Sequence, residues 1–271
     1  MTCRTDWRLV DTGPLDGPAN MAVDEALLDA FDPERSTPVL RLYGWNPPAL
    51  SLGRYQDPAA VLDLDRCRAD GVPAVRRITG GGVIYHADEL TYAIVCAPQH
   101  LPPASTVKDS FRHLTGFLLA FYRGLGLDAA WAADVAADSG RLGERTAFCF
   151  AGKEDFDILV DGAKIGGNAQ RRLRHAIFQH GSIPLADRVP TGIGYLREEP
   201  AAADLAVTSL ETLGITLPPE ALFARLAASF SDALGATLAP SSLTPAEQAG
   251  AAALRCGKYA EHDWAFRTFP S

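Results

Sequence analysis

The residues best suited to chemistry lie in two glycine-rich segments and at one cysteine between them. The first segment, residues 76–86, reads RRITGGGVIYH, and the second, residues 161–170, reads DGAKIGGNAQ. Cys149 lies between them, flanked on each side by phenylalanine. Glycine has no Cβ, so a run of three allows positive φ and lets a ligand approach backbone amides. The two segments therefore predict a site built partly from main chain.

The run Gly80, Gly81, Gly82 lies between two segments with strand-like sequences, residues 74–78 and 83–85. A loop held between strands favours a binding loop over a mobile surface turn, which is the structural alternative. Both familiar phosphate-binding motifs require a helix after their glycines. Here β-branched and aromatic residues follow, so both motifs are excluded.

Cys149 is the strongest candidate nucleophile, because a thiolate is stabilised by a nearby cation or by backbone amides. A buried core cysteine is the alternative on position alone. Lys164 lies beside small residues, where its ammonium could stabilise charge that develops during acyl transfer, or could simply be exposed on a hairpin. His86 and His180 suit acid–base work or a structural place in a strand.

Composition narrows the class of protein. The chain has 271 residues, 47% hydrophobic and 21% charged, which is typical of a soluble globular protein. A net charge of −8 argues against nucleic-acid binding. The five cysteines show no paired spacing that would indicate a metal site or a disulfide framework. Without an apolar run for a membrane span or a signal peptide, we expect a cytoplasmic protein with no membrane association, no metal and no cofactor.

Hydrophobic periodicity predicts an α+β fold. Residues 105–126 are expected to form a long amphipathic helix, and residues 156–166 a β-hairpin turning at Asp161-Gly162. A first helix capped by Asn20, a helix over residues 208–213, and a last helix opening at Thr244 are also predicted. The chain divides into residues 1–200, a catalytic domain, and residues 201–271, a helical C-terminal extension packed on the same domain.

Three separated motifs in this order resemble the lipoate-protein ligase and octanoyltransferase family. They are residues 76–86, residues 162–170 and the Gln179-His180-Gly181-Ser182 segment, with further similarity over residues 20–26 and 41–45. The similarity covers about residues 7–190, with a weaker echo at Lys258-Tyr259 and Trp264. It implies the catalytic fold of biotin and lipoate ligases, which is similar to that of class II aminoacyl-tRNA synthetases, with mixed β-sheets flanked by helices.

The resemblance also implies a tunnel for a medium-length acyl chain. The residues it places there as substrate-binding are Arg76, Arg77, Gly80, Gly81, Gly82, His86, Gly166, Gly167, Asn168 and His180, with Lys164 as a catalytic residue. Cysteine-dependent octanoyltransferases of this family carry their nucleophile in a segment like residues 146–150, so Cys149 is expected to be catalytic. Residues 89–92 and the short C-terminal part also favour a transferase over a ligase.

The resemblance thus predicts transfer of octanoate from octanoyl-acyl carrier protein, through a cysteine thioester, to a lysine of a lipoyl domain or glycine-cleavage H protein. The alternatives are an ATP-dependent lipoate-protein ligase, an octanoyl amidotransferase between lipoyl carrier proteins, and a non-catalytic acyl or carrier-protein binding module. One position departs from the family: Ala87 follows His86 where an aspartate is usual, and Asp88 comes next. This departure counts most against the ATP-dependent ligase.

Overall fold

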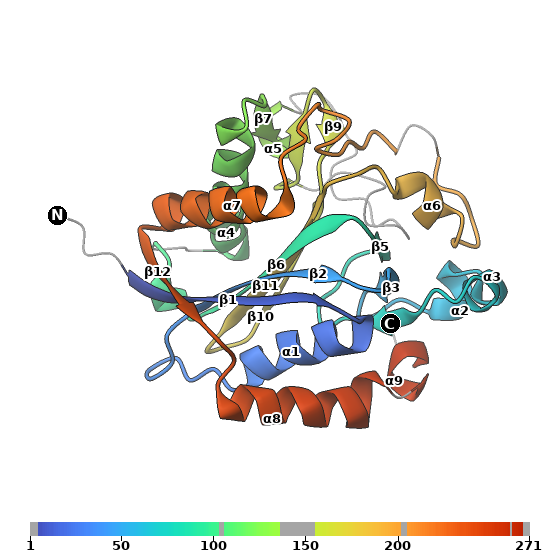
Figure 1. Ribbon diagram of the computed structural model, residues 1–271, viewed down its shortest axis with the longest axis horizontal. Coiled ribbons are helices and arrows are strands. Elements are labelled where there is room, and N and C mark those ends of the chain that lie inside the picture. Colours follow the sequence, from blue (N-terminus) through green and yellow to red (C-terminus); the bar gives the residue numbers. More distant parts are fainter. Residues whose placement is uncertain (1–4, 103–105, 136–154, 202–204, 261, 268–271) are drawn as a thin grey trace.

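The structure of the protein is a computed structural model that describes residues 5–102, 106–135, 155–201, 205–260 and 262–267. A mixed six-stranded sheet forms its centre (Figure 1). In spatial order the strands are β10 (Gly167–Arg172), β11 (Ile177–Pro184), β6 (Glu89–Cys96), β2 (Val39–Trp45), β1 (Thr5–Leu15) and β12 (Ala236–Ser241). The first four are antiparallel neighbours, whereas β1 pairs in parallel with both β2 and β12.

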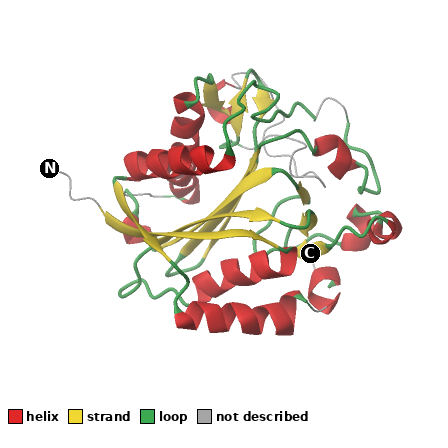
Figure 2. Ribbon diagram, viewed as in Figure 1, coloured by secondary structure: helices red, strands yellow, loops and turns green. Residues whose placement is uncertain are grey.

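Helices cover both faces of this sheet (Figures 1 and 2). On one face lie α4 (Val107–Gly124) and α7 (Pro219–Leu234), and on the other lie α1 (Gly17–Asp29) and α8 (Pro245–Leu254). The ring of Phe230 from α7 lies 5.0 Å from Trp7 and 5.2 Å from Phe117, edge-on to both. Because both faces are covered, all eight residues of β6 are buried.

Two three-stranded sheets flank the central one. The glycine-loop sheet consists of β4 (Ala74–Arg76), β3 (Ala49–Leu52) and β5 (Ile84–His86), and β4 and β5 enclose the glycine loop, residues 79–82. The other sheet consists of β7 (Ala129–Trp131), β8 (Ile158–Val160) and β9 (Ala163–Lys164). The short helical elements are α2 (Pro58–Val61), α3 (Leu64–Ala69), η1 (Pro98–His100), α5 (Ala132–Val135), α6 (Val189–Ile193), η3 (Arg255–Tyr259) and α9 (His262–Phe266).

The elements with the strongest local signals are confirmed. The long helix is α4, which begins after a Thr106–Asp109 capping box. The predicted hairpin is β8–β9, whose turn residues Asp161 and Gly162 both have positive φ. The helix predicted to open at Thr244 is α8, which begins after that cap, although η3 and α9 follow it.

Two helix predictions are wrong. The first helix is capped by Asp16, because Pro18 favours a helix start one turn earlier; the Asn20 side chain instead donates to the Leu15 and Gly44 carbonyls. Residues 208–213 form a turn instead of a helix. The turn covers residues 210–214, and the Leu210 and Glu211 N–H groups tie it to the carbonyls of Pro184 and Leu185 at the end of β11.

The C-terminal part is more than a set of helices, because β12 extends the central sheet beside β1. The domain boundary at residue 200 remains a prediction. Across the described residues, no helix combines the length and apolar character needed to span a membrane.

Candidate active site

A narrow pocket opens between the glycine-loop sheet and the central sheet; its space is about 330 Å³ when open solvent at the mouth is included, and the cavity itself is about 20 Å³. Its lining combines apolar and polar side chains with glycine backbone. The residues are Met21, Tyr43, Trp45, Ser51, Arg77, Ile84, His86, Thr91, Gly167, Asn168, Ala169, His180, Gly181 and Ser182. The structure thus brings five of the predicted site residues into one cavity: Arg77, His86, Gly167, Asn168 and His180.

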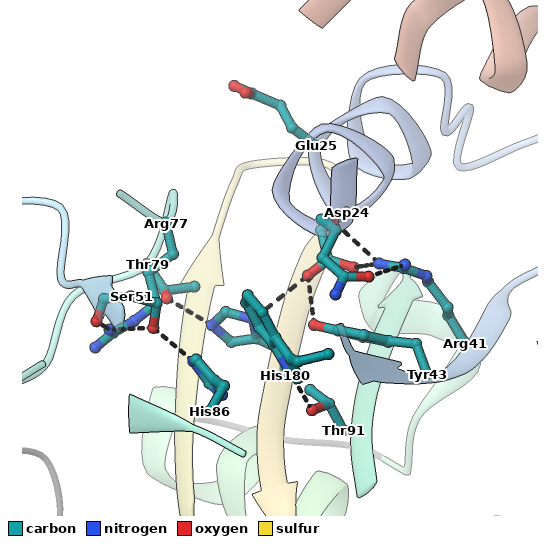
Figure 3. Close-up of polar contacts among 12 residues, drawn as sticks. Asp24, Glu25, Arg41, Tyr43, Ser51, Arg77, Thr79, His86, Thr91 and His180 are labelled. Carbon is teal, nitrogen blue, oxygen red and sulfur yellow. Dashed lines mark hydrogen bonds and ion pairs between the residues drawn. The ribbon is translucent and has the colours of Figure 1, made fainter. Parts of the chain in front are cut away.

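One wall of the pocket contains what we call the Glu89 bridge, formed by Ser51, His86 and Glu89 (Figure 3 shows Ser51 and His86). The Ser51 hydroxyl lies 2.7 Å from His86 Nε2, and His86 Nδ1 lies 2.8 Å from Glu89 Oε1. A carboxylate only accepts, so in the neutral imidazole Nδ1 carries the proton and Nε2 accepts from Ser51. Thr91 and Ser182 donate to the same carboxylate at 2.5 and 2.7 Å. The bridge therefore joins β3 and β5 to the central sheet.

The His86 ring stacks on Trp45, with 3.9 Å between ring centroids and 8° between planes. Trp45 is held in turn, because its Nε1 donates to Thr91 at 2.8 Å. The stacked pair presents a flat, rigid surface to the pocket.

A second wall contains the Asp24 bridge, formed by Thr79, His180 and Asp24 (Figure 3). The Thr79 hydroxyl lies 2.7 Å from His180 Nε2, and His180 Nδ1 lies 3.5 Å from Asp24 Oδ2. Asp24 also forms a buried ion pair with Arg41 at 2.6 Å and accepts from Tyr43 at 2.9 Å. This bridge joins the glycine loop to β11 and α1.

Burial and charge set the protonation of the Asp24 bridge. Burial lowers the pKa of His180 although Asp24 acts to raise it, so the imidazole is neutral near pH 7. Burial would raise the pKa of Asp24, but Arg41 and His180 outweigh that effect and hold it below its ordinary value. The bridge therefore combines a neutral imidazole with an ionised carboxylate.

Arg77 connects the glycine loop to the Glu89 bridge. Its guanidinium donates to the carbonyls of Gly80 and Gly82, both at 2.7 Å, and to the carbonyl and hydroxyl of Ser51 at 2.8 and 3.2 Å. Its predicted place in the site is consistent with its position in the pocket wall. Gly80, Gly81 and Gly82 form the loop behind this side chain and are not among the residues that line the pocket.

Gly81 shows why the loop requires glycine. Its φ is +92°, and a Cβ there would lie 2.9 Å from Arg77 Nη2. At Gly80, in contrast, φ is not positive and a Cβ would meet no other atom within 4 Å. The fold itself therefore requires glycine at position 81 more than at position 80.

Arg76, although adjacent to Arg77, lies outside the pocket lining. It is fully buried and its guanidinium donates to main-chain carbonyls of Gly53, Arg54, Gln56, Trp264, Ala265 and Arg267. The predicted role of Arg76 in substrate binding therefore finds no support in its placement, because β-strand alternation points neighbouring side chains to opposite faces.

Lys164 is buried and its Nζ lies 2.7 Å from Asp157 Oδ2. It is therefore not an exposed hairpin lysine, although it does not line the pocket. Gly166, two residues on, has φ +83°, and a Cβ there would lie 2.1 Å from the Ser182 carbonyl. Through this close contact at Gly166, the chain passes from Lys164 to Gly167 and Asn168 in the pocket wall. Cys149 lies outside the described residues, so its role as the catalytic nucleophile remains a prediction.

Sequence reasoning missed much of the pocket. Among the residues missed as site residues, Trp45, Ser51 and Ser182 line the pocket, whereas Asp24, Arg41 and Glu89 are buried behind it. Most of them lie in segments that carry the family resemblance. The available signal was a polar residue within an apolar strand or helix face, since buried polar groups require partners.

The pairing of polar side chains in the pocket wall indicates which kind of ligand the pocket suits. The polar side chains in the wall hydrogen-bond to one another or to backbone, as the two bridges, Arg77 and the 2.7 Å contact of Tyr92 with Asn168 show. Because most of these polar groups already have protein partners, the wall needs few hydrogen bonds from a ligand and suits an apolar chain. Among the described residues, no group of three His, Cys, Asp or Glu side chains is arranged to hold a metal ion. The absence of a cofactor remains a prediction.

Comparisons with known proteins show the family of this chain. The family model described as the lipoyl protein ligase A/B catalytic domain matches residues 16–231. A protein named octanoyltransferase LipM from Symbiobacterium thermophilum is 39% identical, over 97% of this chain and 99% of its own length. One of the same name from Geobacillus kaustophilus is 34% identical, over 96% and 98%. The reaction class of this chain is therefore acyl transfer.

Solved structures show the fold. A lipoate-protein ligase A bound with ATP superposes with a TM-score of 0.81 at 22% identity, covering 98% of this chain and all of that one. A bipartite lipoate protein ligase from Thermoplasma acidophilum gives 0.80 at 21%, covering 99% of both chains. The predicted α+β ligase-type fold is confirmed. On its sequence and on its fold, the chain belongs to the lipoyl protein ligase A/B catalytic domain family.

Proposed function

We propose that this protein transfers octanoate from octanoyl-acyl carrier protein to a lysine of a lipoyl domain or glycine-cleavage H protein in lipoate biosynthesis. The observation that carries the proposal is the pocket wall, whose polar side chains are mostly paired with other protein groups, which suits a saturated acyl chain. The names of the relatives support octanoate as that chain. One structural neighbour is described as part of an archaeal lipoylation system with its E2 lipoyl domain, which supports a lipoyl domain as acceptor.

In the first step, the Cys149 thiolate attacks the thioester carbonyl of the donor. The carrier thiol leaves as a thiolate and takes up a proton, and the octanoyl group remains on Cys149. Lys164 contributes positive charge near the developing oxyanion. Asp157, 2.7 Å from its Nζ, fixes where that charge lies.

In the second step, the neutral ε-amine of the acceptor lysine attacks the Cys149 thioester. An amide forms, the amine loses a proton, and the thiol of Cys149 is restored. The octanoyl group passes from one thioester to another and then to a more stable amide. The overall transfer is therefore favourable in free energy and needs neither ATP nor a metal. His86, Arg77 and His180 bind the chain as parts of the pocket wall and take no part in bond breaking.

The test is intact-protein mass spectrometry after mixing the enzyme with octanoyl-acyl carrier protein in the absence of ATP. We expect the mass of one octanoyl group on the wild type and none on Cys149→Ala. Cys256→Ala is the matched control, because Cys256 is exposed and should not affect loading. Loading that persists in Cys149→Ala, or no loading without ATP, would reject the mechanism.

The acceptor is tested by adding a lipoyl domain or H protein to the loaded enzyme. We expect the octanoyl mass to move to the acceptor, and not to a variant whose modified lysine is replaced by arginine. If mass is lost from the enzyme as free octanoate instead, the acceptor assignment is wrong.

A further inference from the structure

Arg76 joins two segments that are far apart in the sequence. Nη1 donates to the carbonyls of the turn at residues 53–56, and Nε and Nη2 donate to the C-terminal helix α9 and to Arg267 directly after it. The distances are 3.1 Å to Gly53, 2.9 Å to Arg54, 2.8 Å to Gln56, 3.1 Å to Trp264, 3.1 Å to Ala265 and 2.7 Å to Arg267. Only arginine has a planar fork of N–H groups that can reach carbonyls on both sides at once.

On the C-terminal side, Arg76 caps α9. The last carbonyls of a helix have no partner within it, and a cation there is favourable. Trp264 returns the contact, because its Nε1 donates to the Arg76 carbonyl at 3.0 Å. The Trp264 ring also lies 3.9 Å from Lys258 Nζ, and Lys258 pairs with Glu25 of α1 at 2.6 Å. Figure 3 shows Glu25 pointing away from the residues of the Asp24 bridge.

On the other side, the turn at residues 53–56 packs backbone to backbone against the glycine loop. The Arg54 N–H donates to the Thr79 carbonyl at 2.8 Å. A Cβ on Gly53 would lie 1.9 Å from the Gly81 carbonyl oxygen, so no side chain separates the two segments. A displacement of the turn must therefore displace the loop that carries Thr79 of the Asp24 bridge.

We infer that α9 is a latch on the pocket: α9 and Arg76 hold the turn at residues 53–56, and the turn fixes the glycine loop. Arg76 is thus a positioning residue that acts through main chain. The effect on acyl binding rests on the proposed function, whereas the effect on the loop does not.

Hydrogen exchange on the full-length chain tests the latch without substrate. Arg76→Lys keeps the positive charge but cannot bridge both sides, so backbone exchange over residues 77–86 should quicken at least about tenfold. Exchange over residues 111–121 of α4 should not change. Arg8→Lys is the matched control, because Arg8 ties β1 to Glu247 of α8 and does not contact the loop. Unchanged exchange at 77–86 in Arg76→Lys would overturn the inference.

Trp264→Phe provides a second variant that keeps a ring over Lys258 and removes only the N–H donated to Arg76. We expect faster exchange over residues 77–86, by a smaller factor. The double variant should exchange no faster than Arg76→Lys alone, because both act on the same contact. Full additivity of the two effects would contradict a single latch.

Acyl loading gives the functional readout. In Arg76→Lys we expect a higher KM for octanoyl-acyl carrier protein, while the rate at which iodoacetamide alkylates Cys149 stays within about twofold of wild type. A parallel fall in alkylation would show general damage and would reject the latch. If the wild type itself is not loaded, the proposed function fails and the exchange experiment still decides the latch.

Discussion

The two bridges across the pocket have the same composition and different charge balance. Each joins a hydroxyl, an imidazole and a carboxylate, and each links the glycine-loop side to the central sheet. Glu89 accepts from His86 and from two neutral hydroxyls, whereas Asp24 has Arg41 at 2.6 Å and His180 only at 3.5 Å.

The difference separates two tasks. The Glu89 bridge uses its carboxylate to fix the tautomer and orientation of His86, because Nδ1 lies 2.8 Å from it. The Asp24 bridge uses its carboxylate mainly to balance a fully buried arginine. Replacing the carboxylate by an amide should therefore change the free energy of unfolding by different amounts in the two bridges.

The largest effect is expected from Asp24→Asn. It leaves Arg41 buried without its counter-charge, which should lower the free energy of unfolding by about 3–5 kcal/mol. Denaturant unfolding measures this change. Glu25→Gln, one residue along the same helix, is the control and should cost less, about 1–3 kcal/mol, because its partner Lys258 is partly exposed and an amide can still accept from Tyr259. Equal costs would mean that the fully buried Arg41 pair is no more important than a partly exposed pair.

Glu89→Gln should destabilise less. The amide group would turn an N–H₂ toward side chains that already donate, leaving a buried donor unpaired at a cost of about 1–3 kcal/mol. Its matched control is Asp88→Asn at the adjacent residue, whose ion pair with Arg188 is half exposed and worth less than about 1 kcal/mol. A Glu89→Gln cost as large as that of Asp24→Asn would remove the distinction between the bridges.

Substitutions in the glycine loop test the segment that carries Thr79, the hydroxyl of the Asp24 bridge. Gly81→Ala forces a residue with a Cβ into φ +92°, at a cost of about 1–2 kcal/mol, while Gly80→Ala should be within about 0.5 kcal/mol of wild type. Thermal unfolding measures both. If Gly80→Ala nevertheless loses acyl loading, Gly80 meets the substrate as the sequence predicts; unchanged loading would leave it a loop residue only.

The smallest effect concerns pH. Burial lowers the pKa of His180 below the ordinary 6.5, so below pH 6.5 the unfolded chain binds a proton that the folded chain does not. The free energy of unfolding should fall as pH drops from 6.5, and His180→Gln should show a shallower fall. Some slope should remain, because burial also lowers the pKa of His100. An identical slope in the variant would show that His180 does not titrate with unfolding.

The sequence alone predicted the elements whose signals are local. The helix α4 follows from apolar periodicity and the hairpin β8–β9 from an Asp-Gly turn, and both signals lie within one segment of the sequence. The family, and with it the fold, follow from motifs that are recognised by their residue types and their order in the sequence. The predicted pocket residues Arg77, His86 and His180 came from those motifs.

Only the tertiary structure decided which polar residues meet. Asp24 and His180 are far apart in the sequence, and so are Arg76 and Trp264; no local rule pairs them. Adjacent in the same motif, Arg76 and Arg77 serve different parts of the molecule because strand geometry turns their side chains to opposite faces. A motif fixes residue types and their order, but the partner of a buried charge depends on which distant segment folding brings against it.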